Sequence, residues 1–249
     1  QAALGFRLVA VLWQFWLVRG YVSEGRSWIA GLLARETSAA ATPERACALN
    51  GAGLLAWSRN DFRAATALLD QALAAFTALG DAHGRAWALN HLGQVELAYE
   101  HTARAITLFD ESLALFRAEG AGWNMGWTLL NLGLASWARA DHEQAERHFA
   151  ESLALFRQTG EQRGIAWALE HLGRNALLRG DTARAHQLLS ESLALFRAMH
   201  DQEGSAWLLE HCSRIIPNSS PPMRARVSRE RTRVRNICAS CLSSSSPTA

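Results

Sequence analysis

The sequence predicts an all-α solenoid of stacked helical hairpins, and three observations lead to this fold class. Helix-forming Ala and Leu dominate the 249 residues, whereas residues that favour strands are sparse, with only 2 Tyr. Each stretch of 40 residues holds two segments whose apolar side chains recur every three or four positions, as on one face of a helix. Single residue types also return at intervals of 40, which indicates a repeat architecture. The columns are Trp87, Trp127, Trp167 and Trp207; Gly53, Gly93, Gly133 and Gly173; Ala65, Ala105, Ala145 and Ala185; and Phe76, Phe116, Phe156 and Phe196.

The repeat divides the chain into three parts. Four units stay in register, and a fifth begins after them. Before the first unit, Gly25 falls in the alanine column, so this stretch is interpreted as a degenerate hairpin. After the last unit, an Arg-, Ser- and Pro-rich segment has no apolar period and is expected to be disordered. The expected boundaries are 1–47 for the degenerate hairpin, 48–87, 88–127, 128–167 and 168–207 for the four units within 48–212, and 213–249 for the tail.

Helix boundaries follow from the residues between the apolar segments. Thr42, Pro43 and Glu44 have the types preferred at the cap, the first position and the first turn, so a helix is expected to begin there. Within each unit, an Asp such as Asp61 follows a polar break and is suited to cap the second helix. A glycine such as Gly80 is suited to end it. Each helix is expected to span about 16–18 residues, or about 25 Å.

Small residues recur in the middle of each hairpin. A glycine inside a helix costs about 1 kcal/mol relative to alanine. The column that includes Gly93 therefore indicates a neighbouring helix that crosses too closely for a side chain. The alanine column, with Ala105, is interpreted as the other side of this contact, and Phe and Leu fill the space around it.

These spacings resemble the tetratricopeptide repeat. The resemblance implies a right-handed α-solenoid of tetratricopeptide-like hairpins, here with a 40-residue period, that binds a protein or peptide. The chain departs from the family in unit length, 40 rather than about 34 residues, and in lacking the usual proline at the end of the unit. In one unit, the residues that carry the resemblance are Leu89, Leu92, Gly93, Ala105, Phe109, Ser112 and Leu113.

A narrower resemblance suggests a biological setting. The segment from Phe15 to Trp28 and the recurring Glu-Ser-Leu-Ala-Leu-Phe-Arg resemble large bacterial signalling regulators. In those proteins an NTPase module of the STAND type precedes tetratricopeptide repeats, and a LuxR-type helix-turn-helix often follows. The resemblance implies a sensory or partner-binding segment of a multidomain transcriptional or signalling regulator. A free-standing peptide-binding adaptor is the alternative. This sequence contains no NTPase motif, and residues 213–249 do not show a helix-turn-helix pattern.

Composition excludes several kinds of chemistry. The chain has no Lys, so it cannot contain a Walker phosphate-binding loop, a kinase-type lysine or a Schiff-base lysine. Residues 1–212 hold 18 Arg and 22 acidic residues, and this mildly acidic body is not expected to bind nucleic acid. The apolar stretch 8–18 is too short to span a bilayer. The protein is expected to be a cytoplasmic, non-catalytic scaffold with no membrane partner, and its oligomeric state is left open.

Other motif-like patterns are weaker than the repeat. Residues 51–53 match part of a dinucleotide fingerprint but fall inside a predicted helix rather than after a strand. The histidines in 142–148 miss the metalloprotease spacing, and the two cysteines in 238–241 supply half of the ligands that zinc needs. No cofactor and no metal ion is therefore expected. A further column spreads along the array, and we expect it to be a solvated surface ladder: His91, His171 and His211.

A binding surface is expected on the first helix of each unit. In tetratricopeptide arrays these helices line a concave groove, and residues six and three before the repeat glycine face it. Tryptophan there would stack on an extended peptide or an amphipathic helix, and amides would bind its backbone. The alternative is that Trp only fills space between long helices, and the sequence leaves both interpretations open. The candidate groove residues are Trp57, Trp87, Asn90, Gln94, Trp127, Leu130, Trp137, Trp167, Glu170, Arg174 and Trp207.

Overall fold

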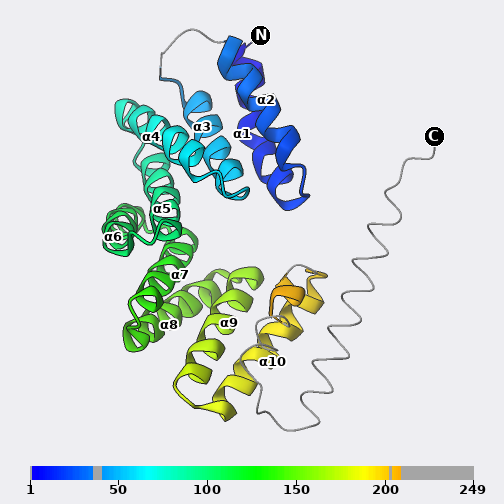
Figure 1. Cartoon of the computed structure of the whole chain (residues 1–249), viewed down its shortest axis with the longest axis vertical. Coiled ribbons are helices and arrows are strands. Elements are labelled where there is room, and N and C mark those ends of the chain that lie inside the picture. The colour runs from blue at the N-terminus through cyan, green and yellow to red at the C-terminus, as the bar shows by residue number, and fades with distance from the viewer. Residues whose placement is uncertain (1, 36–40, 202–203, 209–249) are drawn as a thin grey trace, which may run out of the picture. The chain divides into compact units, whose positions relative to one another are not determined.

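A computed structural model describes residues 2–35, 41–201 and 204–208, and it confirms the predicted all-α solenoid of helical hairpins (Figure 1). The chain divides into two compact units, Gln1–Asp141 and His142–Ala249, and each is described by itself. The first contains α1 (Ala2–Val18), α2 (Val22–Arg35), α3 (Pro43–Trp57), α4 (Phe62–Leu79), α5 (Ala82–Ala98), α6 (Thr102–Glu119) and α7 (Gly122–Ala138). The second contains α8 (His142–Thr159), α9 (Gln162–Leu178), α10 (Thr182–Ala198) and a helical stretch at 204–208.

We call α3, α5, α7 and α9 the A helices and α4, α6, α8 and α10 the B helices. Several of them begin at the residues that the sequence predicts. The hydroxyl of Thr42 accepts a hydrogen bond from the backbone N–H of Arg45 at 3.3 Å, which caps α3. Asp61 caps α4 in the same way, and Asp181 caps α10. Each cap satisfies a backbone N–H group that has no partner within its helix.

Both turns of a hairpin unit use left-handed backbone. The B helices α4 and α6 end at Gly80 and Gly120, with φ of 68° and 67°. Glycine suits this conformation because it has no Cβ to clash with the following carbonyl. The turn from A to B helix is also left-handed, at Gly180 but equally at Asn60 and Glu100. The turn from B to A helix is indicated by its glycines. In the turn from A to B helix, Gly180 and Asn60 also favour left-handed backbone, whereas Glu100 does not indicate it.

The glycine column marks a close helix contact, as predicted. A Cβ atom on Gly93 would lie 2.5 Å from the ring of Phe109, and one on Gly173 would lie 2.6 Å from Cγ of Leu189. The side chain that occupies this space comes from the B helix of the same hairpin. It stands four residues after the column alanine, which is itself fully buried at Ala105 and at its equivalents.

A buried serine ties each of two B helices to the A helix before it. Ser112 Oγ donates a hydrogen bond of 2.8 Å to the carbonyl oxygen of Ala86, and Ser192 Oγ donates one of 2.8 Å to that of Ala166. Four residues further on, Phe116 and its equivalents are fully buried. The small serine thus permits close packing and also satisfies its own hydroxyl.

The alanine column gives a stability prediction. Ala145 in α8 has no exposed surface, so Ala145→Leu places three extra carbon atoms in a filled core. We expect the substitution to lower the free energy of unfolding by about 1–3 kcal/mol through overpacking. Urea unfolding followed by circular dichroism measures this change. Ala150→Leu is the matched control, because Ala150 lies exposed on the same helix, and equal effects of the two substitutions would refute the predicted packing.

Candidate functional site

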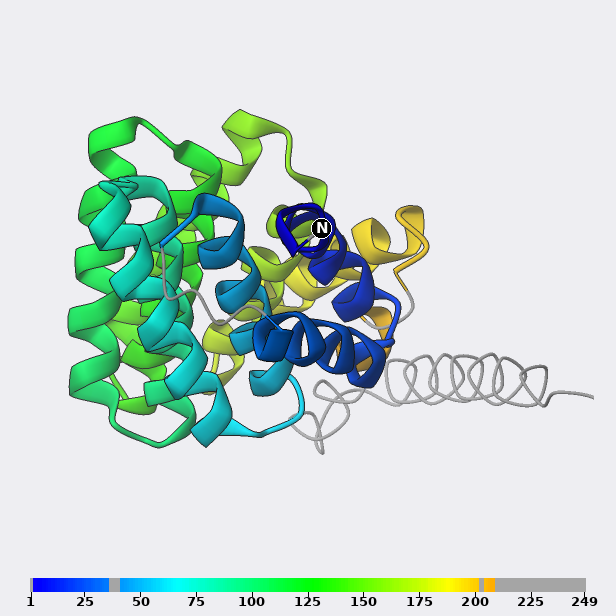
Figure 2. The same ribbon diagram turned by 90° about the horizontal axis from the view of Figure 1, so that it is seen from above.

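The three A helices of the first unit, α3, α5 and α7, form its inner layer. α3 contacts α5 and α5 contacts α7, whereas α4 and α6 do not contact each other although both are fully described. Neighbouring helices are therefore closer together in the A layer than in the B layer. Figure 2 shows the ribbons of this unit from above, and α5 and α7 contact each other within the layer.

A ladder of buried polar side chains joins the helices of this layer. Asn90 has no exposed surface, and its Nδ2 donates to Thr128 Oγ1 at 2.9 Å. Asn131 Nδ2 donates to Asn90 Oδ1 at 3.0 Å, so two hydrogen bonds connect α5 with α7. His91 Nδ1 donates to Asn50 Oδ1 at 3.0 Å, which connects α5 with α3. The ladder fixes the amides of this layer, since a buried polar group is costly without its partner.

An aromatic cluster lies beside this ladder. The Trp123 ring lies 5.8 Å from the Trp87 ring and 6.3 Å from the Trp127 ring, measured between centroids. Trp87 also packs edge-on against the buried Phe116 ring at 5.3 Å. Trp87 and Trp127 are half-buried, whereas Trp123 remains 40% exposed. Residues three and four apart share a helix face, so Trp87 lies on the stripe of α5 that holds Asn90.

In the second unit, α9 holds a buried charge cluster. Glu170 has no exposed surface, and its carboxylate pairs with Nδ1 of His171 at 2.6 Å and with Nη1 of Arg174 at 3.3 Å. Burial alone would raise the pKa of Glu170, but the charges of His171 and Arg174 outweigh it and hold that pKa below its ordinary value. The carboxylate is therefore ionised at neutral pH, and it is neutralised within its own helix.

The tryptophan of α9 has aromatic neighbours of its own. Trp167 packs edge-on against the buried ring of Phe196 at 5.2 Å, and its ring lies 6.3 Å from that of Trp207. Trp207 is 44% exposed in the short helical stretch at 204–208. Trp87 and Trp167 therefore share one arrangement, in which the indole makes a T-shaped contact with the phenylalanine ring of the following B helix.

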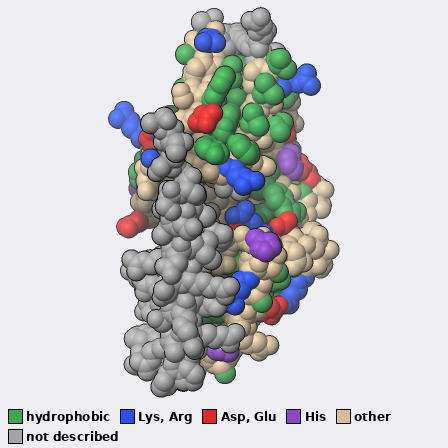
Figure 3. All heavy atoms as spheres, turned by 90° about the vertical axis from the view of Figure 1, so that its right-hand side faces the viewer, with side chains coloured by type: hydrophobic (Ala, Val, Ile, Leu, Met, Phe, Trp, Pro, Cys, Tyr) green, Lys and Arg blue, Asp and Glu red, His purple; other side chains and the backbone are tan. Residues whose placement is uncertain are grey.

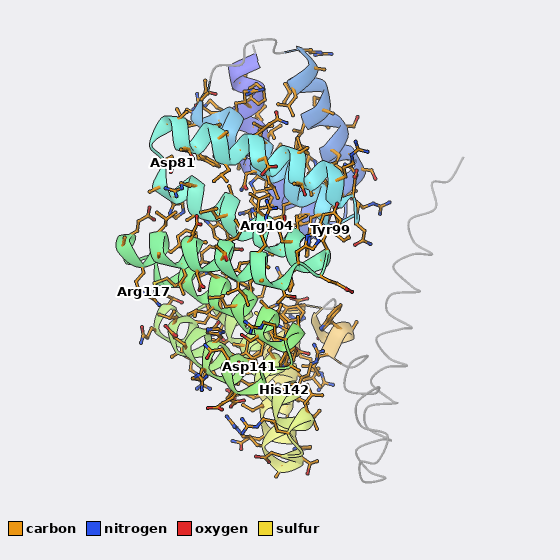
Figure 4. The ribbon with its side chains drawn as sticks, turned by 60° about the vertical axis from the view of Figure 1, so that its left-hand side comes forward. Asp81, Tyr99, Arg104, Arg117, Asp141 and His142 are labelled. Atoms are coloured by element: carbon orange, nitrogen blue, oxygen red, sulfur yellow. The ribbon has the colours of Figure 1, made fainter. Side chains whose placement is uncertain are left out.

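A second buried carboxylate lies near the C-terminal end of α5. Glu96, near the end of α5, pairs with Nδ1 of His101 at 2.8 Å and with Nε of Arg104 at 3.2 Å. The Tyr99 ring stacks on the His101 ring at 5.8 Å. Figure 4 shows the labelled Tyr99 and Arg104 at the same end of the α5–α6 hairpin. This cluster closes the turn between α5 and α6, which is a structural role.

The structure brings part of the predicted groove together. Asn90 lies between the half-exposed Trp87 and Gln94 on α5, and Trp127 lies opposite on α7. Whether these residues bind a partner stays a prediction. Of the eleven candidates, the buried ones are Asn90, Leu130 and Glu170, the exposed one is Trp207, and the half-buried ones are Trp57, Trp87, Gln94, Trp127, Trp137, Trp167 and Arg174.

Trp123 is an exposed aromatic residue of α7 that the repeat columns do not indicate. The equivalent positions hold His83 and Arg163, so no residue type repeats there. The available signal was its spacing of four from Trp127, which places both indoles on one face of α7.

The expectation of a solvated histidine column is wrong for both of its described members. His91 is 5% exposed and His171 is 7% exposed. Neighbouring helices cover the faces of α5 and α9 that carry these histidines. His91 bonds to Asn50 of α3, and the His171 ring stacks on Phe149 of α8 at 5.1 Å. His211 lies outside the described residues.

The described part of the chain holds neither a candidate metal site nor a candidate membrane-spanning helix. No group of three His, Cys, Asp or Glu side chains there could hold a metal ion. None of its helices combines the length and apolar character needed to cross a membrane. The paired cysteines and the rest of 213–249 lie outside the described residues, as does most of the fifth repeat.

The buried histidine predicts a pH dependence of stability. Burial lowers the pKa of His91 from 6.5 to about 4, so the folded chain keeps this imidazole neutral where the unfolded chain protonates it. The unfolded state then binds more protons between these two values. We therefore expect His91 to reduce stability as the pH falls from 6.5 to 4, by about 3 kcal/mol in all.

Urea unfolding at a series of pH values measures this effect against His91→Asn. The substitution copies Asn131, the residue at the equivalent position of the next unit. The variant should lose less stability than the parent over this pH range, while His186→Asn, at an exposed position of α10, should follow the parent. Identical pH profiles for the parent and His91→Asn would contradict a buried neutral His91.

The architecture defines the chain as a repeat protein built from stacked helical hairpins. The sequence model of the tetratricopeptide repeat matches residues 43–118 and 124–198, which is more than half of the chain. The chain therefore belongs to the tetratricopeptide-repeat family, whose fold is a non-enzymatic scaffold for protein interactions. No curated protein matches the sequence.

Solved structures give the same fold at low sequence identity. The apo form of RapI is 12% identical, with a TM-score of 0.74, and the match covers 94% of this chain and 83% of RapI. The Rap conjugation gene regulator of plasmid pLS20, solved in complex with the Phr* peptide, is 13% identical with a TM-score of 0.74, covering 89% of this chain and 61% of that one. BtubC from P. vanneervenii is 16% identical with a TM-score of 0.66, covering 100% and 93%.

Proposed function

We propose that the inner layer of the first unit binds an extended peptide segment of a partner protein. The observation that carries this proposal is the partly open cluster of Trp87, Trp123 and Trp127 beside the partly exposed amide of Gln94, whose Nε2 donates to Oδ1 of the buried Asn90 at 3.5 Å. Indole faces stack on apolar and planar groups, and fixed amides hydrogen-bond a peptide backbone.

The other predicted groove residues differ in how much of their side chains is exposed. Trp57 and Trp137 stand near the C-terminal ends of α3 and α7 and are half-buried. In the second unit, which is considered by itself, Trp167 and Arg174 of α9 expose part of their side chains, whereas Glu170 does not. Within the first unit, we assign contact with the peptide to the partly exposed side chains and the positioning of those side chains to the buried ones.

We further propose that the chain serves as the sensing segment of a cytoplasmic bacterial regulator, in signal transduction or transcription. The family membership and the resemblance of the segment from Phe15 to Trp28 support this setting. The structural likeness to a Rap conjugation gene regulator solved with a peptide agrees with it. A free-standing adaptor would use the same inner layer, so the peptide test below applies to both.

A displayed library of random dodecapeptides tests the binding proposal. The library is selected on the whole chain, and the affinities of individual peptides are then measured by fluorescence polarisation. We expect saturable binding that Trp123→Ala weakens about 30-fold, the equivalent of about 2 kcal/mol for an aromatic anchor. Trp28→Ala is the matched control, because Trp28 is also exposed but lies on α2. No selected peptide, or equal losses in the two variants, would refute the site.

A further inference from the structure

Apolar contact alone does not distinguish the inner layer of the first unit from its other surfaces. Leu8 and Val11 of α1 are 55% and 75% exposed, and Figure 3 shows hydrophobic side chains gathered at the level of α1 and α2. What the inner layer offers in addition is the hydrogen-bonded ladder that joins α5 with α7. The specificity of this surface therefore depends on which polar atoms the ladder turns outward.

A backbone carbonyl fixes the direction of the hydrogen bonds in this ladder. Thr128 Oγ1 lies 3.1 Å from the carbonyl oxygen of Asn124, which can only accept, so the hydroxyl donates its single hydrogen there. Thr128 Oγ1 must then accept from Asn90, whose Nδ2 donates to it at 2.9 Å. The other end of the Asn90 amide is therefore its oxygen, which accepts hydrogen bonds from the rest of the ladder.

Two further amides meet at this oxygen. Asn90 Oδ1 accepts from Nδ2 of Asn131 at 3.0 Å and from Nε2 of Gln94 at 3.5 Å, which uses both of its lone pairs. Because both nitrogens bond to Asn90, each amide directs its own oxygen away from Asn90. Within the described part of the chain, neither Gln94 Oε1 nor Asn131 Oδ1 has a hydrogen-bond donor, and both reach solvent. We call these two oxygens the acceptor pair.

Indole rings lie one and two helical turns from the acceptor pair. Trp127 precedes Asn131 by four residues on α7, and Trp87 precedes Gln94 by seven on α5, so each indole shares a helix face with an amide of the pair. Both indoles are half-buried. The face of an indole ring attracts cations, and the planar guanidinium of arginine also stacks on it.

The charges of α5 and α7, which are both fully described, do not oppose a cation at this place. α7 has no ionisable side chain. Arg85, the arginine of α5, is two residues from Trp87 and therefore lies on the opposite side of that helix. One turn before Trp87, Nδ1 of His83 lies 2.8 Å from a carboxylate oxygen of Glu119 at the end of α6. This end of the inner layer thus carries no uncompensated positive charge.

We propose that an arginine side chain of the bound peptide occupies this place, with its guanidinium donating to the acceptor pair and lying against the indole of Trp127. The inference rests on the peptide binding proposed above and names a residue that the peptide must carry. A guanidinium presents its N–H groups as a planar fork that reaches two oxygens at once, whereas a lysine ammonium is a compact charge without a stacking face. An acidic side chain would meet two oxygens and no cation.

Three displayed dodecapeptide libraries, selected on the whole chain, test this inference. Their sixth residue is arginine, lysine or glutamate, and every other position is random but uncharged. We expect the arginine library to yield the tightest binders. Replacing that arginine by glutamine should weaken the affinity measured by fluorescence polarisation about 10- to 100-fold, the range for hydrogen bonds to a charged group.

The outcomes separate this inference from peptide binding as such. Binders that tolerate the replacement of arginine, or that come equally from the glutamate library, would overturn the inference. If Trp123→Ala still weakened those binders, the peptide site itself would stand. A chain that selects no peptide from these libraries or from the fully random one would overturn both.

Substitutions of Gln94 test the same contact from the side of the protein. Gln94→Arg and Gln94→Leu copy Arg174 and Leu134, the residues at the equivalent positions of later units, so the A helices of this chain accommodate both. Each should weaken binding of the arginine peptide at least about 10-fold, and Gln94→Arg more than Gln94→Leu because it adds a like charge. Gln71→Arg is the matched control, because Gln71 is exposed on α4, and it should retain the affinity of the parent. Circular dichroism should be unchanged in all three variants, and unchanged affinity in Gln94→Arg would overturn the inference.

Discussion

Glu170→Ala should lower the free energy of unfolding by about 3–5 kcal/mol. The carboxylate is fully buried, with Nδ1 of His171 at 2.6 Å and the Arg174 guanidinium at 3.3 Å. Removing the carboxylate leaves the Arg174 charge without its partner, and losing one member of a buried pair costs more than the pair contributes. Urea unfolding at neutral pH measures the loss, and a loss below about 1 kcal/mol would contradict the buried pair.

The chain itself provides the control for this experiment. At the three equivalent positions, the unit 128–167 has Leu130, Asn131 and Leu134. The triple substitution Glu170→Leu, His171→Asn and Arg174→Leu therefore replaces the charge cluster by a set that already packs in the inner layer. We expect this variant to be about as stable as the parent, because well-packed apolar residues replace buried ion pairs at little or no cost. A triple variant as unstable as Glu170→Ala would instead assign the loss to local packing.

The hairpins could be predicted from the sequence because their contacts constrain residue size. A residue larger than glycine at Gly93 would meet Phe109, and a polar cap at Asp61 satisfies the first turn of α4. Such constraints recur in every unit and leave columns that are visible in the sequence. The left-handed turn at Glu100 leaves no such sign, because its conformation is set by the two helices that it joins.

The burial of the site residues could not be predicted in the same way. α5 contacts its own B helix, the preceding B helix and both neighbouring A helices, and α9 lies against α8 and α10, so each has little surface left for solvent. Polar residues such as Asn90 and Glu170 therefore lie in the packed layer, where partners on other helices or on the same helix compensate them. The polarity of these residues alone predicts exposed side chains. The positions of their hydrogen-bond and ion-pair partners, which the sequence does not give, are what allow the side chains to be buried.

Trp87→Ala should lower the free energy of unfolding by about 3 kcal/mol, whereas Trp123→Ala should change it by less than about 1 kcal/mol. The two rings belong to one cluster, 5.8 Å apart, but their surroundings differ. Trp87 covers the buried Phe116 ring at 5.3 Å and stacks on His91 at 5.4 Å, so its removal leaves a cavity inside the hairpin packing. Trp123 is 40% exposed and has less burial to lose.

The two variants should rank the opposite way in their loss of affinity for peptide if the indole of Trp123 is an anchor for a partner. A truncated anchor weakens affinity by about 2 kcal/mol or more, while the fold stays intact. Trp123→Ala should thus retain the unfolding midpoint of the parent and lose affinity for the selected peptides. Trp87→Ala should lose stability first, and its affinity should be compared at a temperature where it is fully folded. If both variants lost stability equally and neither lost affinity, the indoles of α5 and α7 would be filling space between helices, and the inner layer would not be the peptide site.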